Sequence, residues 1–158
     1  MRSEALQAAL EARKKYPTPR QDLFVIVDYG RSKRVPRLHV VDSSNNSIIR
    51  EFLVAHGTGS GKGEATMFSN VVNSHMSSLG AMKTGDTYHG KYGRSLKLHG
   101  LEKGVNDNVF ARFIVVHGSL YVTNKFVGNS WGCLAVPMKE AQDLIDMIKG
   151  GVLVYAHF

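Results

Sequence analysis

The chain contains a single cysteine, Cys133, and a lone thiol is either a small packing residue or a reactive group. His117 lies sixteen positions earlier and directly follows the apolar run 113–116. A histidine just past a buried strand stands on a rigid platform, and the intervening loop can return the thiol to it. Because the reactive form of cysteine is the thiolate, a neighbouring imidazole would activate it. The pattern therefore predicts nucleophilic catalysis by cysteine.

Two other kinds of site are suggested by the glycine-rich stretch 57–63 and by the seven histidines. A phosphate-binding loop needs four residues between its glycines and Ser or Thr after its lysine. Here three residues separate Gly57 from Gly61, and Gly63 follows Lys62, so we expect a flexible loop. No two histidines have the close spacing of a zinc motif, so we expect no metal. Distant ligands that converge in space would leave metal-dependent hydrolysis as an alternative.

Length and composition predict one compact domain, with 158 residues of which 43% are hydrophobic. The formal net charge of +7 favours polyanionic surroundings such as nucleic acid, an anionic membrane face or a bacterial envelope. The basic residues are scattered, with small clusters at 13–15 and 31–34, so we expect no nucleic-acid partner. No segment approaches the roughly 20 apolar residues of a membrane span. The acidic, amphipathic start of the chain differs from an export signal.

The spacing of apolar residues predicts a mostly β fold with peripheral helices. We expect a helix over 3–15 with Ser3 as its N-cap, and a second helix that Pro137 opens and that ends before Gly150. Segments rich in β-branched residues predict strands at 23–27, 37–41, 48–55, 111–116 and 152–155. We expect the first three of these strands to form an antiparallel sheet. Residues 56–110 show the spacing of only one strand, around 96–101.

The catalytic pattern resembles the signature of a known family. His117-Gly118, eleven residues and then Ser130-x-Gly132-Cys133 are similar to the L,D-transpeptidase catalytic domain of the YkuD type. The resemblance covers about residues 22–157 and extends through the blocks 54–57, 68–70, 77–80, 83–88, 90–98, 100–102 and 106–108. Many members carry Arg or Asn two residues beyond the cysteine, whereas this chain has Ala135, a trait of one branch of the family.

The resemblance implies a β-sandwich-like fold of mixed sheets, with an N-terminal helix and proline-containing connector at 1–20 and a catalytic domain at 21–158. Cys133 would attack the carbonyl that joins meso-diaminopimelate to a terminal D-alanine, and His117 would take the thiol proton. The Gly118 carbonyl would orient the imidazole. The oxyanion would be held by backbone amides of Trp131, Gly132 and Cys133, where glycine permits a tight turn. An amine of a neighbouring stem peptide would release the thioester, without a cofactor.

The resemblance also implies peptidoglycan stem peptides as the partner, and we expect a monomer. Ser130 would line or support the pocket. The substrate's carboxylates would be contacted by Tyr88, Lys91, Arg94 and Arg112, although these residues would equally suit a solvated basic face.

The acceptor stays open, because water in place of the amine would make the same site a peptidase or amidase. The enzyme would act on the bacterial cell wall, in the periplasm. A chain that starts on a helix without an export signal fits a trimmed sequence, a lost leader, or a phage endolysin released through a holin. The positive charge also fits a third and remote hypothesis, in which the protein is a wall-binding module without catalytic activity.

Overall fold

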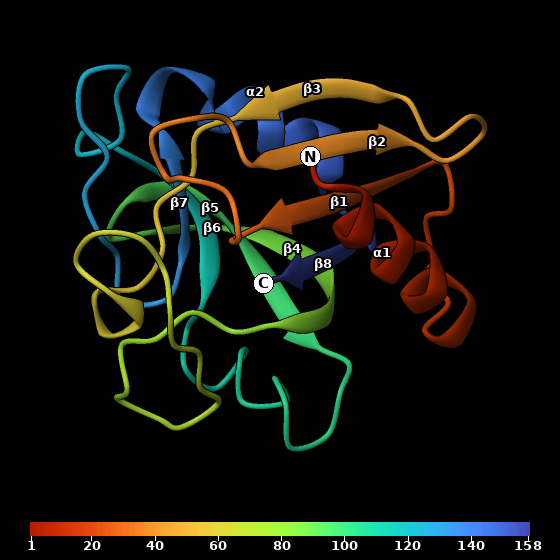
Figure 1. The fold of residues 1–158 in the computed structure, drawn as a ribbon, viewed down its shortest axis with the longest axis horizontal. Helices are drawn as coiled ribbons and strands as arrows, with labels where there is room; N and C mark the ends of the chain where they lie inside the picture. Colours follow the sequence, from red (N-terminus) through yellow and green to blue (C-terminus); the bar gives the residue numbers. More distant parts are fainter.

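A computed structural model describes all residues, 1–158, and shows eight strands in one mixed sheet (Figure 1). The order across the sheet is β3-β2-β1-β8-β4-β5-β6-β7. Two neighbouring pairs, β1 with β8 and β6 with β7, are parallel, and the other pairs are antiparallel. The strands are β1 Leu23–Asp28, β2 Leu38–Asp42, β3 Ile48–Phe52, β4 Gly80–Gly90, β5 Gly93–Gly100, β6 Val115–Ser119, β7 Leu134–Pro137 and β8 Leu153–His157.

The two helices, α1 Ser3–Lys15 and α2 Met138–Ile148, cover different faces of this sheet. Successive residues of β1 point to opposite faces of the sheet. Val25 packs in the core beneath α2, and Phe24 packs in the smaller cluster beneath α1. The buried face of α2 presents Ala141, Leu144, Ile145 and Ile148 at helical spacing. The buried face of α1 consists of Ala5, Ala9 and Ala12, whose short side chains let the helix lie close to the strands.

A third apolar cluster covers the outer face of β7, opposite α2. It joins Leu53, Ala55 and Ala135 to Val122 and Val127 of the loop that connects β6 to β7. Ala135 lies directly across from His117 in the parallel β6–β7 ladder. Since paired residues of neighbouring strands face the same side, this loop covers the face on which His117 lies.

The predicted mostly β fold with peripheral helices is confirmed, and so are the first helix and the antiparallel arrangement of β1, β2 and β3. The expected cap was wrong: Arg2 is the N-cap, no side chain caps the helix, and Ser3 is its first residue. Strand β4 was missed, although it has eleven residues. Its sequence holds few β-branched residues, and hydrogen bonds to β5 and β8 on both sides stabilise it instead.

The strand expected over 111–116 starts later, at Val115. Residues 102–113 form turns, and Phe113 has a φ of +53°, which interrupts an extended chain. His117 therefore lies inside β6 and not just past its end. Neither helix is long and apolar enough to cross a membrane.

Candidate active site

Cys133 lies immediately before β7, with its side chain partly accessible. The Val115 N–H points at Sγ from 3.5 Å, and Sγ lies 3.4 Å from the carbonyl oxygen of Phe113. Burial raises the pKa of the Cys133 thiol, while the Val115 N–H and the positive charge of Arg112 oppose that rise. The thiol is therefore neutral at rest, and a nucleophilic role requires a base.

His117 is buried in β6, and its Nδ1 lies 2.9 Å from the carbonyl oxygen of Gly118. A carbonyl only accepts, so Nδ1 carries the proton and Nε2 keeps its lone pair. Nε2 of His117 has no hydrogen-bond partner. Two other unpaired polar atoms, His39 Nε2 and Ser43 Oγ, are fully enclosed by the protein, whereas Nε2 of His117 is not. Burial lowers the pKa of His117, so the imidazole is neutral near pH 7.

The β6–β7 ladder places the two residues two rungs apart. Val116 pairs with Leu134 and His117 pairs with Ala135, and the contact from Val115 to Sγ extends this register back to Cys133. Diagonal neighbours of this kind are on the order of 7–8 Å apart at Cα, within reach of long side chains. The register thus brings His117 and Cys133 to the same edge of the sheet, two rungs of the ladder apart.

The turn that presents the cysteine is built around Ser130, which is buried. Its Oγ donates to the carbonyl of Cys133 at 2.8 Å and accepts the Gly132 N–H at 3.1 Å. Gly132 has a φ of +115°, and a Cβ there would meet the Met76 carbonyl oxygen at 2.8 Å. The Gly132 amide is thus engaged, whereas the Trp131 and Cys133 amides donate to no protein acceptor.

Two aromatic stacks flank the pair, and the sequence reasoning missed both. Tyr92, at the turn between β4 and β5, stacks on the His117 ring with centroids 4.2 Å apart and planes 13° from parallel. His75 stacks on Trp131 at 4.4 Å and 2°. Gly90 and Gly93 around Tyr92 signal a turn, but no local pattern shows what a turn residue touches across the fold.

Arg112 ties the segment 69–78 to the wall of the site. Its guanidinium donates to four oxygens of that segment: Ser69 O at 2.8 Å, Ser74 Oγ at 3.1 Å, Met76 O at 2.8 Å and Ser78 Oγ at 3.2 Å. Burial lowers the pKa of Arg112, and the neighbouring Cys133 opposes that shift. Arg112 therefore lies near the sulfur, with its donors directed at the protein.

The other three residues that were expected to contact the substrate have different surroundings. Burial raises the pKa of Tyr88, and the charge of Cys133 adds to the rise. Lys91 is exposed, with its ammonium over the Tyr92 ring at 5.8 Å. Arg94 turns away, because its guanidinium binds Asp146 at 2.8 Å and Gln142 at 3.1 Å on α2. The contacts of Arg94 thus favour a structural role.

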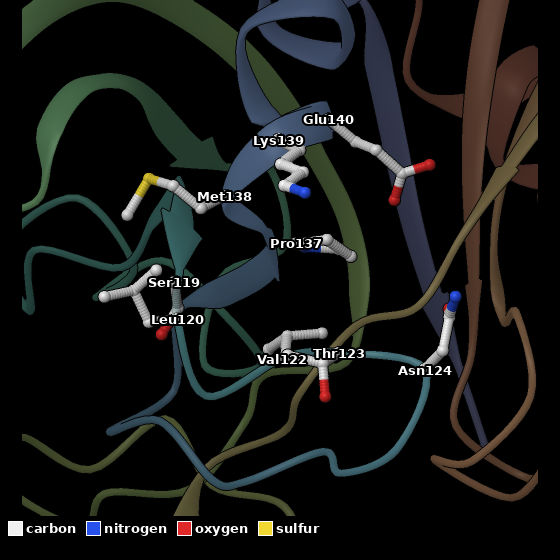
Figure 2. Close-up of a pocket in the computed structure, with 9 residues that line it drawn as sticks. All are labelled: Ser119, Leu120, Val122, Thr123, Asn124, Pro137, Met138, Lys139 and Glu140. Atoms are coloured by element: carbon white, nitrogen blue, oxygen red, sulfur yellow. The ribbon is translucent and has the colours of Figure 1, made fainter.

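A cavity of about 350 Å³ opens at the carboxyl ends of β6 and β7. Figure 2 shows Pro137, Met138 and Glu140 of the β7–α2 junction on one side and Ser119, Leu120 and the 122–124 segment on the other. Ser119 comes two residues after His117, so the cavity adjoins the strand that carries the imidazole. The seven histidines do not gather into any group of three or more potential metal ligands.

Comparisons with known proteins show the family and the fold of the chain. The model of the L,D-transpeptidase catalytic domain family matches residues 1–157. Similar solved structures include an L,D-transpeptidase from Mycobacterium smegmatis (TM-score 0.54, 11% identity, 87% of this chain and 59% of that one). An L,D-transpeptidase from Xylanimonas cellulosilytica gives 0.52 and 20%, covering 96% and 68%. The helical cell shape determining protein Pgp2 from Campylobacter jejuni gives 0.59 and 12%, covering 99% and 56%. A comparison with curated proteins found no match.

The chain therefore belongs to the L,D-transpeptidase catalytic domain family. The match extends over α1 as well as the sheet, and the solved relatives share the fold at low identity. The chain spans 59% of the Mycobacterium smegmatis chain and 56% of the Campylobacter jejuni chain, so those proteins contain further sequence.

Proposed function

We propose that the protein is a cysteine acyltransferase that acts on peptidoglycan stem peptides in the bacterial cell wall. One observation carries this proposal: the Nδ1 contact with the Gly118 carbonyl fixes the His117 tautomer whose free Nε2 can accept a proton, two rungs along the β6–β7 ladder from Cys133. A buried neutral imidazole beside a partly accessible thiol is the arrangement that nucleophilic cysteine catalysis requires.

In the first half-reaction, Nε2 of His117 takes the thiol proton while Sγ attacks the peptide carbonyl. The new C–S bond gives a tetrahedral oxyanion, for which the free amides of Trp131 and Cys133 are the available donors. Collapse breaks the C–N bond, and the imidazolium returns its proton to the leaving amine. The thioester then remains on Cys133.

In the second half-reaction, an acceptor amine loses a proton to His117 and attacks the thioester, which restores the thiol and forms the new peptide bond. Water in the same place would give hydrolysis. The rim of the site is open to solvent, since 69% of Trp131 is exposed. Water can therefore reach the site when no acceptor is bound.

Before substrate binds, the Cys133 thiol and the His117 imidazole are both neutral, because burial raises the pKa of Cys133 and lowers that of His117. The proton consequently moves during attack and not beforehand. Tyr92 is proposed as a positioning residue, because its stacked ring covers one face of the imidazole and keeps water from it.

Incubation with purified tetrapeptide muropeptides, followed by mass spectrometry of the products, tests this function. Cross-linked dimers identify transfer, and shortened stems identify hydrolysis. We expect Cys133→Ala to abolish both while the circular dichroism spectrum is retained. Equal turnover by Cys133→Ala would contradict the proposal. Binding of cell-wall sacculi without any turnover would favour the wall-binding module.

A further inference from the structure

A second cavity of about 440 Å³ lies next to the first and shares Thr123 and Asn124 with it. Four basic side chains line this cavity and no carboxylate does; they are Lys33, Arg34, Lys62 and Lys125. Asn124 and Thr123 add uncharged polar groups, and Phe126, which is 63% exposed, adds an apolar one. We call these residues the basic cavity.

None of the four cations takes part in a salt bridge, whereas Arg2, Lys14, Arg20, Arg94 and Lys149 elsewhere in the chain do. The nearest acid, Glu64, accepts the Ser32 hydroxyl at 2.8 Å and the Lys33 backbone N–H at 2.9 Å. Its carboxylate thus binds the loop that carries Lys33 and Arg34, and it offsets part of the charge of Lys33. Like charges that face one cavity repel each other, and a bound anion would relieve that repulsion.

The basic cavity connects to the cysteine through a short, fixed segment. Lys33 Nζ binds the carbonyl of Lys62 at 2.8 Å and lies 3.5 Å from Asn129 Oδ1. Asn129 also donates to the carbonyl of Gly61 at 3.0 Å, which fixes the start of the turn. Cys133 follows four residues later, a span of at most about 14 Å for an extended chain. A ligand of a few residues can therefore reach both.

We infer that the basic cavity binds carboxylates of the peptidoglycan whose stem peptide is engaged at Cys133. The inference rests on the proposed function, and it names where that substrate's negative charge is recognised. Arg94 and Arg112 are poorer candidates, because their guanidinium groups are already hydrogen-bonded to the protein. In the basic cavity only Lys33 is hydrogen-bonded to the protein, and the side chains of Arg34, Lys62 and Lys125 keep their donors free for a ligand.

Binding can be measured without turnover in the Cys133→Ala protein. Trp131 is the only tryptophan and lies beside the cysteine, so its fluorescence reports on occupancy. The probes are a muropeptide with free carboxylates and the same muropeptide with those groups amidated. We expect amidation to weaken binding, and the added pair Lys62→Glu and Lys125→Glu to raise Kd for the free acid roughly tenfold.

A matched control makes the same change of charge elsewhere. Lys15→Glu with Lys103→Glu alters α1 and the turn after β5, and α1 packs on β1, β8 and β4, away from the edge of the sheet that β6 and β7 form (Figure 1). Kd should change by less than about twofold in this control, since isolated surface charges contribute little. Equal effects of the two pairs, or equal binding of both probes to the parent, would overturn the inference.

Three further outcomes bear on this inference, and the first two separate it from the proposed function. If the Lys62 and Lys125 changes weaken muropeptide binding but the protein with intact Cys133 shows no turnover, the basic cavity is supported and the catalytic proposal fails. If turnover is present and Kd is unchanged by these substitutions, only the basic cavity is refuted. If the substitutions abolish binding of polyphosphate but leave muropeptide affinity intact, the assignment to carboxylates is refuted.

Discussion

Two buried histidines occupy nearly identical stretches of sequence and have different surroundings. His56 ends Val54-Ala55-His56-Gly57, and His117 sits in the similar run 115–118. At His56, Arg37 donates to Nδ1 at 2.8 Å and Nε2 donates to the Gly61 carbonyl at 2.6 Å, so both ring nitrogens are used. At His117, only Nδ1 is used. A histidine that supports the fold has both nitrogens paired, and one available for chemistry keeps a lone pair free.

The largest expected effect distinguishes these two histidines by activity. His117→Gln removes the proposed base and should lower turnover by roughly 10²–10⁴-fold, the usual contribution of general acid–base catalysis. Unfolding by urea should show only a modest loss of stability, on the order of 1 kcal/mol, because the Nδ1 bond to the Gly118 carbonyl is lost while Nε2 has no protein partner. Turnover within twofold of wild type would contradict the assignment of His117.

The reverse result is expected at His56. Substitution of His56→Ala removes the acceptor of one buried Arg37 N–H and one of the two donors to the Gly61 carbonyl, which Asn129 also binds, and this should cost about 1–3 kcal/mol of unfolding free energy. Turnover per folded molecule should be retained. A greater loss of activity than of stability would mean that the fully paired histidine also takes part in the reaction.

Low pH should affect stability through His56 and activity through His117, because burial lowers the pKa of both imidazoles. Burial lowers the pKa of His56 to about 4. Between pH 4 and the unfolded value near 6.5, the unfolded chain binds the proton and the folded one does not, so stability falls as pH falls through this window. The activity of His117 requires its neutral form, and its pKa is lowered too. We expect the acid limb of the kcat/KM profile below pH 6.5; a limb above it would contradict a buried neutral base.

Two glycine substitutions should have smaller effects, and they compare a position in the candidate active site with one in the turn after α2. Gly132→Ala should cost roughly 1–3 kcal/mol because of its positive φ, and it should reduce activity because Cβ would press on the Met76 carbonyl. Gly150→Ala, at a φ of +80° with no neighbour within 4 Å, carries the strain alone. Thermal denaturation should show both losses, and the muropeptide assay should show only the first.

The smallest expected effect concerns the stack on His117. Tyr92→Ala exposes one face of the imidazole, which raises the pKa of His117 towards its ordinary value and moves the acid limb to higher pH. Tyr92→Phe keeps the ring and should restore the wild-type profile. A pure loss of stability, with an unchanged pH profile in both variants, would show that Tyr92 acts only in packing.

The sequence was sufficient for the parts that depend on local pattern. β-branched runs marked β1, β2 and β8, helical spacing marked both helices, and the spacing of His117 and Cys133 indicated the family that the family comparison then showed. It was insufficient where pairing across the fold decides. Strand β4 is held by its two neighbours, and Tyr92 reaches His117 only because the β4–β5 turn folds over β6. The sequence around His56 and His117 also does not show which nitrogen is free.

The central claim is that His117 enables Cys133 to carry the acyl group. Intact-protein mass spectrometry after brief incubation with a tetrapeptide muropeptide and acid quenching tests it most directly. The account predicts a mass increase equal to the donor minus its terminal D-alanine, located on Cys133 by peptide mapping and strongly reduced in His117→Gln. Muropeptide turnover with no adduct on Cys133, and undiminished in Cys133→Ala, would contradict it.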